Sequence, residues 1–204
     1  MPPFSHMPPC TLALRWMIHR GTHATQAGGV AKVARVLKDN YTVGKTIFLT
    51  CGDMTHGSAE GLFTVGDAVI KAVNAVDKAI EDVGGDGVDA FTPGNWDFGY
   101  GPAIFRNRFD IENCTGAPGP QCPPLPANLQ VMAGYEGADG INSESNSVIQ
   151  ANFDAISINL KNAANGTPIL PTYKIIDRNK VRVGVIGITA AIVPQQADVF
   201  NLGL

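Results

Sequence analysis

Several features are scarce or missing in this chain of 204 residues. All four histidines lie at or before His56, and no Asp or Glu precedes Asp39. No apolar run reaches the roughly 18 residues that a membrane-spanning helix needs, so the sequence predicts no membrane span. The net charge is −3, without the basic excess of a protein built to bind nucleic acid, so no nucleic-acid partner is expected.

The four cysteines lack the Cys-x-x-Cys spacing of a structural zinc site. Cys114 and Cys122 flank "TGAPGPQ", whose Gly and Pro residues allow the chain to turn back on itself. This pair could close a small disulfide loop, as in an exported protein, or the two could be unrelated loop cysteines. Cysteine usage therefore leaves the compartment open.

The N-terminus does not have the pattern of a signal peptide. Its apolar run "CTLALRWMI" is interrupted by Arg15, and no basic residues precede a clean apolar stretch. We therefore treat residues 1–26 as an atypical N-terminal segment and residues 27–204 as a domain.

Apolar periodicity predicts alternating helices and strands in the first half of the domain. Residues at i, i+3, i+4 and i+7 predict amphipathic helices over 28–41 and 63–83. The short apolar runs over 45–51 and 86–93 predict buried strands. A helix between two strands indicates a parallel βαβ unit.

The second half begins with a long irregular region, predicted over 107–147 from its Gly, Pro, Asn and Ser content. Residues 153–160 predict a strand, and residues 171–189 predict two strands joined at "DRNK". The segment Val181–Ile188 is so rich in β-branched residues that we expect it to be a central strand. The order of elements predicts an α/β fold with a mostly parallel sheet.

Side chains that carry oxygen follow two of the predicted strands. Asp53 comes after the strand over 45–51, and Asn95 comes after the strand over 86–93. Neighbouring parallel strands lie about 4.8 Å apart, and ligands bind where their carboxyl ends converge. A carboxylate can bridge two divalent cations, and an amide oxygen can complete a coordination sphere. The alternative is that Asp53 caps the following helix and Asn95 makes a turn.

The loops "GDMTHGS" and "GNWDFGYG" resemble the GD…GNH[DE] signature of the calcineurin-like metallophosphoesterases, especially their bacterial 5'-nucleotidase branch. The stretches "GGVAKVARVLK", "SAEGLFTVGDAVIKAVNA", "ANFDAISINL" and "VGVIGITAAIVPQQAD" extend this resemblance from Ala27 to Leu204. The resemblance implies a four-layer α/β sandwich, present here as an N-terminal partial domain over 27–204. It also implies a periplasmic or secreted protein, and it leaves the oligomeric state open.

The same resemblance implies a hydrolase of phosphate esters with two divalent metal ions, Mn, Zn or Mg. In the family, the residue at the position of Asp53 bridges the metals, and the residue at the position of Asn95 binds one metal and contacts the phosphate. The implied substrates are small phosphoesters, nucleotides above all, hydrolysed by a 5'-nucleotidase or a cyclic phosphodiesterase reaction.

The chain departs from the family in its histidines. An Asp-x-His motif should precede the helix over 28–41, but only His19 and His23 occur there, without a carboxylate. The family's later histidines are also missing, because no histidine follows His56. We therefore expect a partial metal site and little activity from this fragment.

Trp96 stands where the family carries its catalytic histidine, and Gly99 stands where it carries the aspartate partner. An indole N–H donates a hydrogen bond but cannot protonate a leaving group. Asn95 and Trp96 are thus the candidates for the catalytic positions. "NWDFGYG" also resembles the Sox-type thiohydrolases, so sulfur-ester cleavage is an alternative function. A non-catalytic metal- or nucleotide-binding protein is an alternative of another class.

Two further residues lie in these loops. His56 follows Asp53 by three positions, and it is either a substrate-binding residue or an exposed loop histidine. Asp97 occupies the family's acidic position, and we expect it to hold the loop rather than bind a metal.

Overall fold

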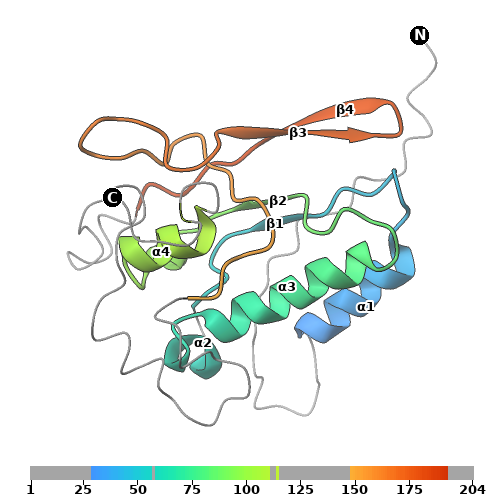
Figure 1. The fold of residues 1–204 in the computed structure, drawn as a ribbon, viewed down its shortest axis with the longest axis horizontal. Helices are drawn as coiled ribbons and strands as arrows, with labels where there is room; N and C mark the ends of the chain where they lie inside the picture. The colour runs from blue at the N-terminus through green and yellow to red at the C-terminus, as the bar shows by residue number, and fades with distance from the viewer. Residues whose placement is uncertain (1–28, 57, 111–113, 115–147, 193–204) are drawn as a thin grey trace.

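The computed structural model describes residues 29–56, 58–110, 114 and 148–192. The elements, in chain order, are α1 (Val30–Asn40), β1 (Leu49–Cys51), α2 (Ala59–Phe63), α3 (Asp67–Glu81), β2 (Ala90–Thr92), the 3-10 helix η1 (Trp96–Phe98), α4 (Pro102–Phe109), β3 (Tyr173–Arg178) and β4 (Val181–Ile186). Figure 1 shows α1 and α3 side by side on one face of the β1–β2 pair, with the β3–β4 ribbon on the other side. The described part is therefore a mixed α/β arrangement.

The predicted parallel βαβ unit is confirmed. β1 and β2 pair in parallel, with Leu49 opposite Ala90 and Cys51 opposite Thr92, and the connection between them contains α2 and α3. The predicted helices are also confirmed, since α1 lies within 28–41 and α3 within 63–83. α3 buries its apolar stripe against the sheet, which is the burial that its 3.6-residue period predicts. The buried apolar residues of α3 are Val69, Ile70, Val73, Val76 and Ile80.

The centre of the core is Phe91 of β2, which has no exposed surface. Its ring lies 5.0 Å from the ring of Phe109 in α4 and 5.8 Å from that of Phe153. Aromatic pairs at such separations add to the free energy gained from burying their apolar area. β2 is thereby packed against segments that come much later in the chain.

The predicted strand over 153–160 forms only in part. Ala155, its third residue, makes one parallel bridge to Phe91, supported by Phe91 N–H to Asp154 O (2.9 Å) and Ile156 N–H to Phe91 O (2.8 Å). Beyond Ile156 the backbone hydrogen bonds are no longer made to β2, since Ile158 N–H donates to Gly187 O at 2.8 Å. The segment therefore joins β2 to the residues that follow β4.

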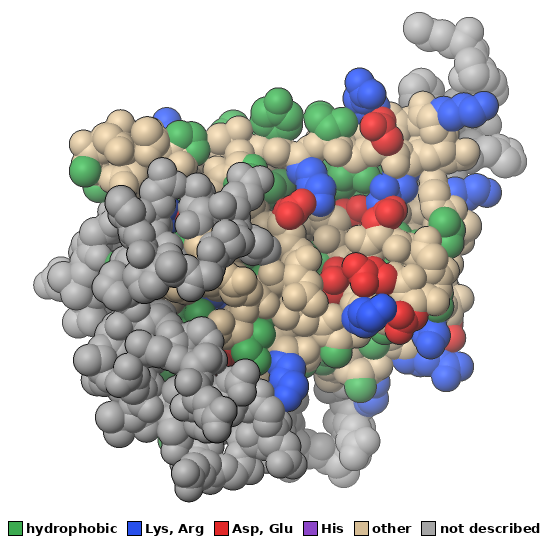
Figure 2. All heavy atoms as spheres, viewed as in Figure 1, with side chains coloured by type: hydrophobic (Ala, Val, Ile, Leu, Met, Phe, Trp, Pro, Cys, Tyr) green, Lys and Arg blue, Asp and Glu red, His purple; other side chains and the backbone are tan. Residues whose placement is uncertain are grey.

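The prediction that residues 181–188 form a central strand is wrong. β4 pairs antiparallel with β3 through a turn at Asn179 and Lys180, and within the described ranges it joins no other sheet. Val181 and Ile186 are 50% and 60% exposed. Figure 2 shows hydrophobic side chains along the upper edge of the molecule, where this ribbon lies in Figure 1. β-branched residues favour the extended backbone wherever the strand lies, so their density indicated a strand and not its burial.

The ribbon is attached to the first sheet by Arg178 of β3. Its guanidinium pairs with the buried carboxylate of Asp89 and with Asp86 (2.9 Å), and it donates to Thr46 O at 3.0 Å. Asp89 in turn accepts the backbone N–H of Phe48 at 2.8 Å. Burial raises the pKa of Asp89, and Arg178 opposes this rise. One carboxylate thus links β3 to the residues just before β1 and β2.

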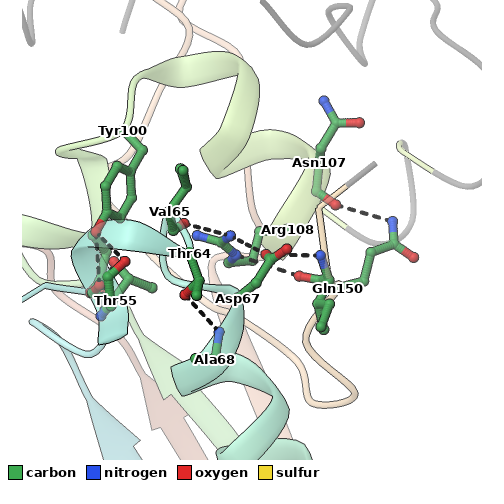
Figure 3. A network of polar contacts seen from close by, with 12 residues as sticks. Thr55, Thr64, Val65, Asp67, Ala68, Tyr100, Asn107, Arg108 and Gln150 are labelled. Atoms are coloured by element: carbon green, nitrogen blue, oxygen red, sulfur yellow. Dashed lines mark hydrogen bonds and ion pairs between the residues drawn. The ribbon is translucent and has the colours of Figure 1, made fainter. Parts of the chain in front are cut away.

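A second buried ion pair ties α4 to the start of α3 (Figure 3). The Arg108 side chain is 1% exposed and donates to Asp67 Oδ1 at 2.7 Å and to Val65 O at 2.9 Å. Asp67 Oδ1 also accepts the backbone N–H of Ile149 at 3.0 Å. Three segments distant in the sequence therefore share one carboxylate.

Some predictions concern other parts of the chain. Residues 1–26 with His19 and His23, most of the loop region over 107–147, and Cys122 lie outside the described residues. The N-terminal segment and the possible disulfide therefore stay predictions. Within the described part, no helix combines the length and the apolar composition that crossing a membrane requires.

Replacing Asp67 by Asn leaves the buried Arg108 guanidinium without its counter-charge. We expect Asp67→Asn to lower the free energy of unfolding by about 3–5 kcal/mol, measured by urea denaturation. The control is Asp39→Asn, because Asp39 pairs with Arg35 on the surface and its side chain is 51% exposed. That change should cost less than about 1 kcal/mol. Similar small losses in both variants would contradict the role of the buried pair.

Candidate metal and substrate site

The loops that follow β1 and β2 touch at two glycines. Gly52 N–H donates to Thr92 O at 2.8 Å, and a Cβ on Gly52 would overlap the backbone of Gly94. A Cβ on Gly94 would in turn meet the side chain and the backbone nitrogen of Asp53. Glycine is therefore required before both Asp53 and Asn95, because only bare backbone allows the loops to approach this closely.

Asp53 reaches from its own loop into the next one. Its Oδ1 accepts the backbone N–H of Trp96 at 3.1 Å. Its own backbone lies in the left-handed region, with φ of 62°. That conformation costs about 1–2 kcal/mol for a residue with a Cβ, and it persists only where neighbouring contacts hold it.

Asp97 makes the reciprocal contact and is 2% exposed. Its carboxylate accepts the backbone N–H groups of Asp53 (2.9 Å), Met54 (2.9 Å) and Thr55 (3.1 Å) from the first loop, and of Gly94 (2.8 Å) from its own. Burial raises the pKa of Asp97, and these donors oppose the rise because they favour the ionised form. The prediction that Asp97 holds the loop is confirmed. We call Asp53, Asp97 and the backbone groups that they bind the loop clasp.

Asn95 lies between the two contacts of the loop clasp. It precedes η1 with right-handed backbone angles (φ −69°, ψ −32°) and is partly buried. Asp53 and Asn95 therefore follow adjacent strand ends, as the sequence predicts, while their roles as metal ligands stay predictions.

The described residues do not fit a centre of two metal ions. No group of three or more His, Cys, Asp or Glu side chains within the described ranges is arranged to hold a metal. Both oxygens of Asp97 already accept backbone N–H groups, which leaves one carboxylate, Asp53, and one amide, Asn95. Two divalent cations need more donors than these. The predicted pair of Mn, Zn or Mg ions would therefore depend on further ligands.

His56 belongs to a row of three aromatic rings, and the expectation of an exposed loop histidine is wrong. Its imidazole stacks on Tyr100 with centroids 4.5 Å apart, and its centroid lies 5.5 Å from that of Trp96. Trp96, at the outer end, is 43% exposed. We call Tyr100, His56 and Trp96 the aromatic ladder. Whether His56 contacts a substrate stays a prediction.

Gly99 makes room for the ladder. A Cβ at Gly99 would lie 2.6 Å from His56 Nε2. The backbone of Gly99 has ordinary helical angles (φ −60°, ψ −19°), so its conformation does not require glycine. In the sequence, Gly99 was notable only because the resembled family carries an aspartate at this position. No pattern in the sequence indicated its contact with His56, which lies 43 positions earlier.

The Nε2 atom of His56 is buried and has no hydrogen-bond partner within the described part of the chain. Leaving such an atom unpaired costs about 1–3 kcal/mol. Burial lowers the pKa of His56, and the nearby charge of Asp97 opposes this shift. The imidazole is therefore neutral at pH 7.

Tyr100 is the inner residue of the ladder, and Figure 3 shows its hydroxyl pointing toward Thr55. Its hydroxyl donates toward two backbone carbonyls, Gly61 O at 2.8 Å and Thr55 O at 3.3 Å. Burial raises the pKa of Tyr100 to about 12, so the hydroxyl keeps its proton. The ladder is thus attached to α2 through Gly61 and to the loop that carries Asp53 through Thr55.

A further polar cluster, which sequence reasoning missed, follows the bridge at Ala155. Ser157 Oγ lies 2.9 Å from Thr189 Oγ1, and Asn159 Nδ2 donates to Thr189 O at 2.7 Å. Nearby, a Cβ on Gly187 would meet the side chain of Thr92 at the end of β2. No spacing in the sequence could reveal the cluster, because its members are about 30 positions apart.

No protein-family model matches this chain, and no curated protein matches it. Among solved structures, the chain is similar to the sulfate thiohydrolase SoxB of Thermus thermophilus, solved in complex with glycerol. The two are 17% identical with a TM-score of 0.48, and the match covers 84% of this chain and 22% of that one. This chain therefore spans about a fifth of the length of that protein.

Removing the Asp97 carboxylate would leave four backbone N–H groups of the loop clasp without their acceptor. We expect Asp97→Ala to lower the free energy of unfolding by about 3 kcal/mol or more, measured by urea denaturation. The control Asp82→Asn removes an exposed pair with Lys78 (2.6 Å) and should cost less than about 1 kcal/mol. An Asp97→Ala protein as stable as the control would contradict the clasp.

The lowered pKa of His56 predicts a pH dependence of stability. Because the unfolded chain takes up a proton first, the free energy of unfolding should fall as the pH drops below 6.5, the ordinary histidine value, until the folded-state pKa is passed. His56→Gln should lack this contribution, so the difference between the two proteins isolates it. An NMR titration of the His56 ring should give a midpoint below 6.5. A midpoint above that value would contradict the burial effect.

Proposed function

We propose that this chain carries part of the active site of a divalent-metal-dependent hydrolase of phosphate esters, with nucleotides as the substrate class. The observation that supports this most directly is the placement of Asp53 and Asn95 at the carboxyl end of the parallel β1–β2 pair, where α/β sheets bind ligands. The loop clasp supports it further, since it holds Asp53 in a strained backbone conformation of the kind that clusters at functional sites.

The two donors suit a hard divalent cation, which prefers carboxylate and amide oxygens. Asp53 would contribute the negative charge, and Asn95 would contribute a neutral oxygen from the adjoining loop. The remaining ligands would come from beyond the described residues, where His19 and His23 are candidates. The four-layer α/β sandwich and a periplasmic or secreted location belong to this proposal.

A second candidate function is hydrolysis of a sulfur ester. The observation that favours it is Trp96, a partly exposed indole beside Asn95 that cannot protonate a leaving group. A sulfur leaving group needs less protonation than an alkoxide, because it is the more stable anion. Sulfur-ester hydrolysis is therefore compatible with Trp96 at this position and requires no other residue to protonate the leaving group.

Metal binding tests the proposed role of Asp53. With one carboxylate and one amide, we expect the chain to bind Mn²⁺ at one site with a dissociation constant of about 10⁻³ M, or weaker. Mn²⁺ titration followed by electron paramagnetic resonance measures this value. Asp53→Asn should weaken binding at least about tenfold because it removes the charged donor of the candidate pair Asp53 and Asn95. Asp39→Asn, a surface change on α1, should leave binding as it is.

The metal titration and an assay of 5'-AMP hydrolysis test different parts of the proposal. Mn²⁺ affinity that does not respond to Asp53→Asn would overturn the proposal. Hydrolysis of 5'-AMP should stay near background, because the described donors are too few. Turnover that Asp53→Asn abolishes would show that other residues of the chain complete the site, and would support the proposed reaction.

A further inference from the structure

The indole of Trp96 is exposed, while the backbone of the same residue is bound by Asp53. The phenylalanines of the core, such as Phe91 and Phe98, are at most 2% exposed, whereas Trp96 is 43% exposed. Its backbone N–H is bound by Asp53, and it directly follows Asn95. An exposed aromatic surface therefore adjoins the two candidate metal ligands.

The other two rings of the aromatic ladder, His56 and Tyr100, lie behind the indole. His56 lies 5.5 Å from Trp96 and stacks in turn on Tyr100, whose hydroxyl is bound to two backbone carbonyls. A ring held in this way loses little conformational freedom when a ligand stacks on it. The arrangement is consequently better suited to binding than a mobile surface tryptophan would be.

Gly99 is the residue that makes this support possible. Ordinary backbone angles would admit alanine at this position, but the methyl group would lie 2.6 Å from His56 Nε2. Gly99 and His56 are thus matched in size, and the match decides where the imidazole lies behind Trp96.

We propose that Trp96 is a stacking surface for a planar aromatic group of the ligand, and that Gly99 and His56 position its indole. The inference rests on the proposed function for the identity of that group, which would be the base of a nucleotide whose phosphate lies toward Asp53 and Asn95. Bases stack on aromatic side chains without needing specific hydrogen bonds, because every base presents a π face. The surface therefore selects for an aromatic group and not for one particular base.

Fluorescence tests the stacking directly. The chain has two tryptophans, so Trp16→Phe leaves Trp96 as the sole reporter. Titration of this protein with adenosine or 5'-AMP should quench the emission in a saturable manner, whereas ribose 5-phosphate should not. Equal quenching by ribose 5-phosphate, or no response to adenosine and 5'-AMP, would overturn the proposal.

Substitutions at Trp96 test whether 5'-AMP binding depends on the aromatic ring of this residue. Trp96→Leu should weaken 5'-AMP binding by about 5- to 150-fold, measured by equilibrium dialysis, as expected for loss of one base–aromatic stack. Trp96→Tyr keeps a ring and should retain affinity within about fivefold of the parent. Equal losses in the two variants would overturn the stacking role.

The positioning role of Gly99 has its own test. Gly99→Ala should lower the urea midpoint and weaken 5'-AMP binding in the otherwise unchanged chain. In a His56→Ala background, the same substitution should lower the midpoint much less, because the overlap with the imidazole is gone and only the 3.1 Å approach to Trp96 O remains. A midpoint that falls equally in both backgrounds would overturn the size match between Gly99 and His56.

The results also distinguish this inference from the proposed function. If adenosine quenches the emission but Asp53→Asn does not change the Mn²⁺ affinity, the stacking surface is supported and the metal site is overturned. If the Mn²⁺ affinity depends on Asp53 but adenosine does not quench the emission, the metal site is supported and the stacking surface is overturned. Tighter binding of 5'-AMP when Mn²⁺ is present, lost in Asp53→Asn, would support both.

Discussion

The loop clasp is the interaction on which the rest of the candidate site depends. Asp53 binds the backbone of the second loop, and Asp97 binds the backbone of the first, so each loop fixes the conformation of the other. The clasp is possible only because β1 and β2 are neighbours in parallel and Gly52 and Gly94 let their loops touch. Its consequences extend to Asn95 and Trp96, which lie between the contacts, and to the aromatic ladder beyond them.

Asp97 is one case of a wider pattern, in which buried carboxylates join segments that are far apart in the chain. A buried carboxylate is costly in itself, and donors that point at it offset this cost by favouring its ionised form. In the part of the chain that the structure describes, four buried acids act in this way: Asp97 on the loop after β1, Asp67 on Arg108, Asp89 on Arg178 and Phe48, and Asp77 on the backbone of Val88. Each of these carboxylates binds groups from another segment of the chain. Together they therefore hold in contact parts of the fold that are far apart in the sequence.

Three residues that differ from the metallophosphoesterase signature, Trp96, Gly99 and His56, lie next to one another in the fold. A tryptophan in place of a catalytic histidine, a glycine in place of its aspartate partner and a histidine three residues past Asp53 look unrelated along the chain. In the fold, Gly99 leaves the space that His56 fills, and His56 packs behind Trp96. The residues that break the signature in these two loops are therefore in contact with one another and form a single exposed aromatic surface.

The sequence by itself determined the local elements and the positions just after them. The apolar periods of α1 and α3, the strand character of β1 and β2, and the placement of Asp53 and Asn95 after those strands follow from patterns only a few residues long. Tertiary structure alone decided that β4 is an exposed ribbon strand, that 153–160 makes a single bridge, and that His56 lies over Gly99. The reason is physical: periodicity reports which side of an element is apolar, whereas the identity of the surface that covers it depends on contacts between residues tens of positions apart, which leave no mark on local spacing.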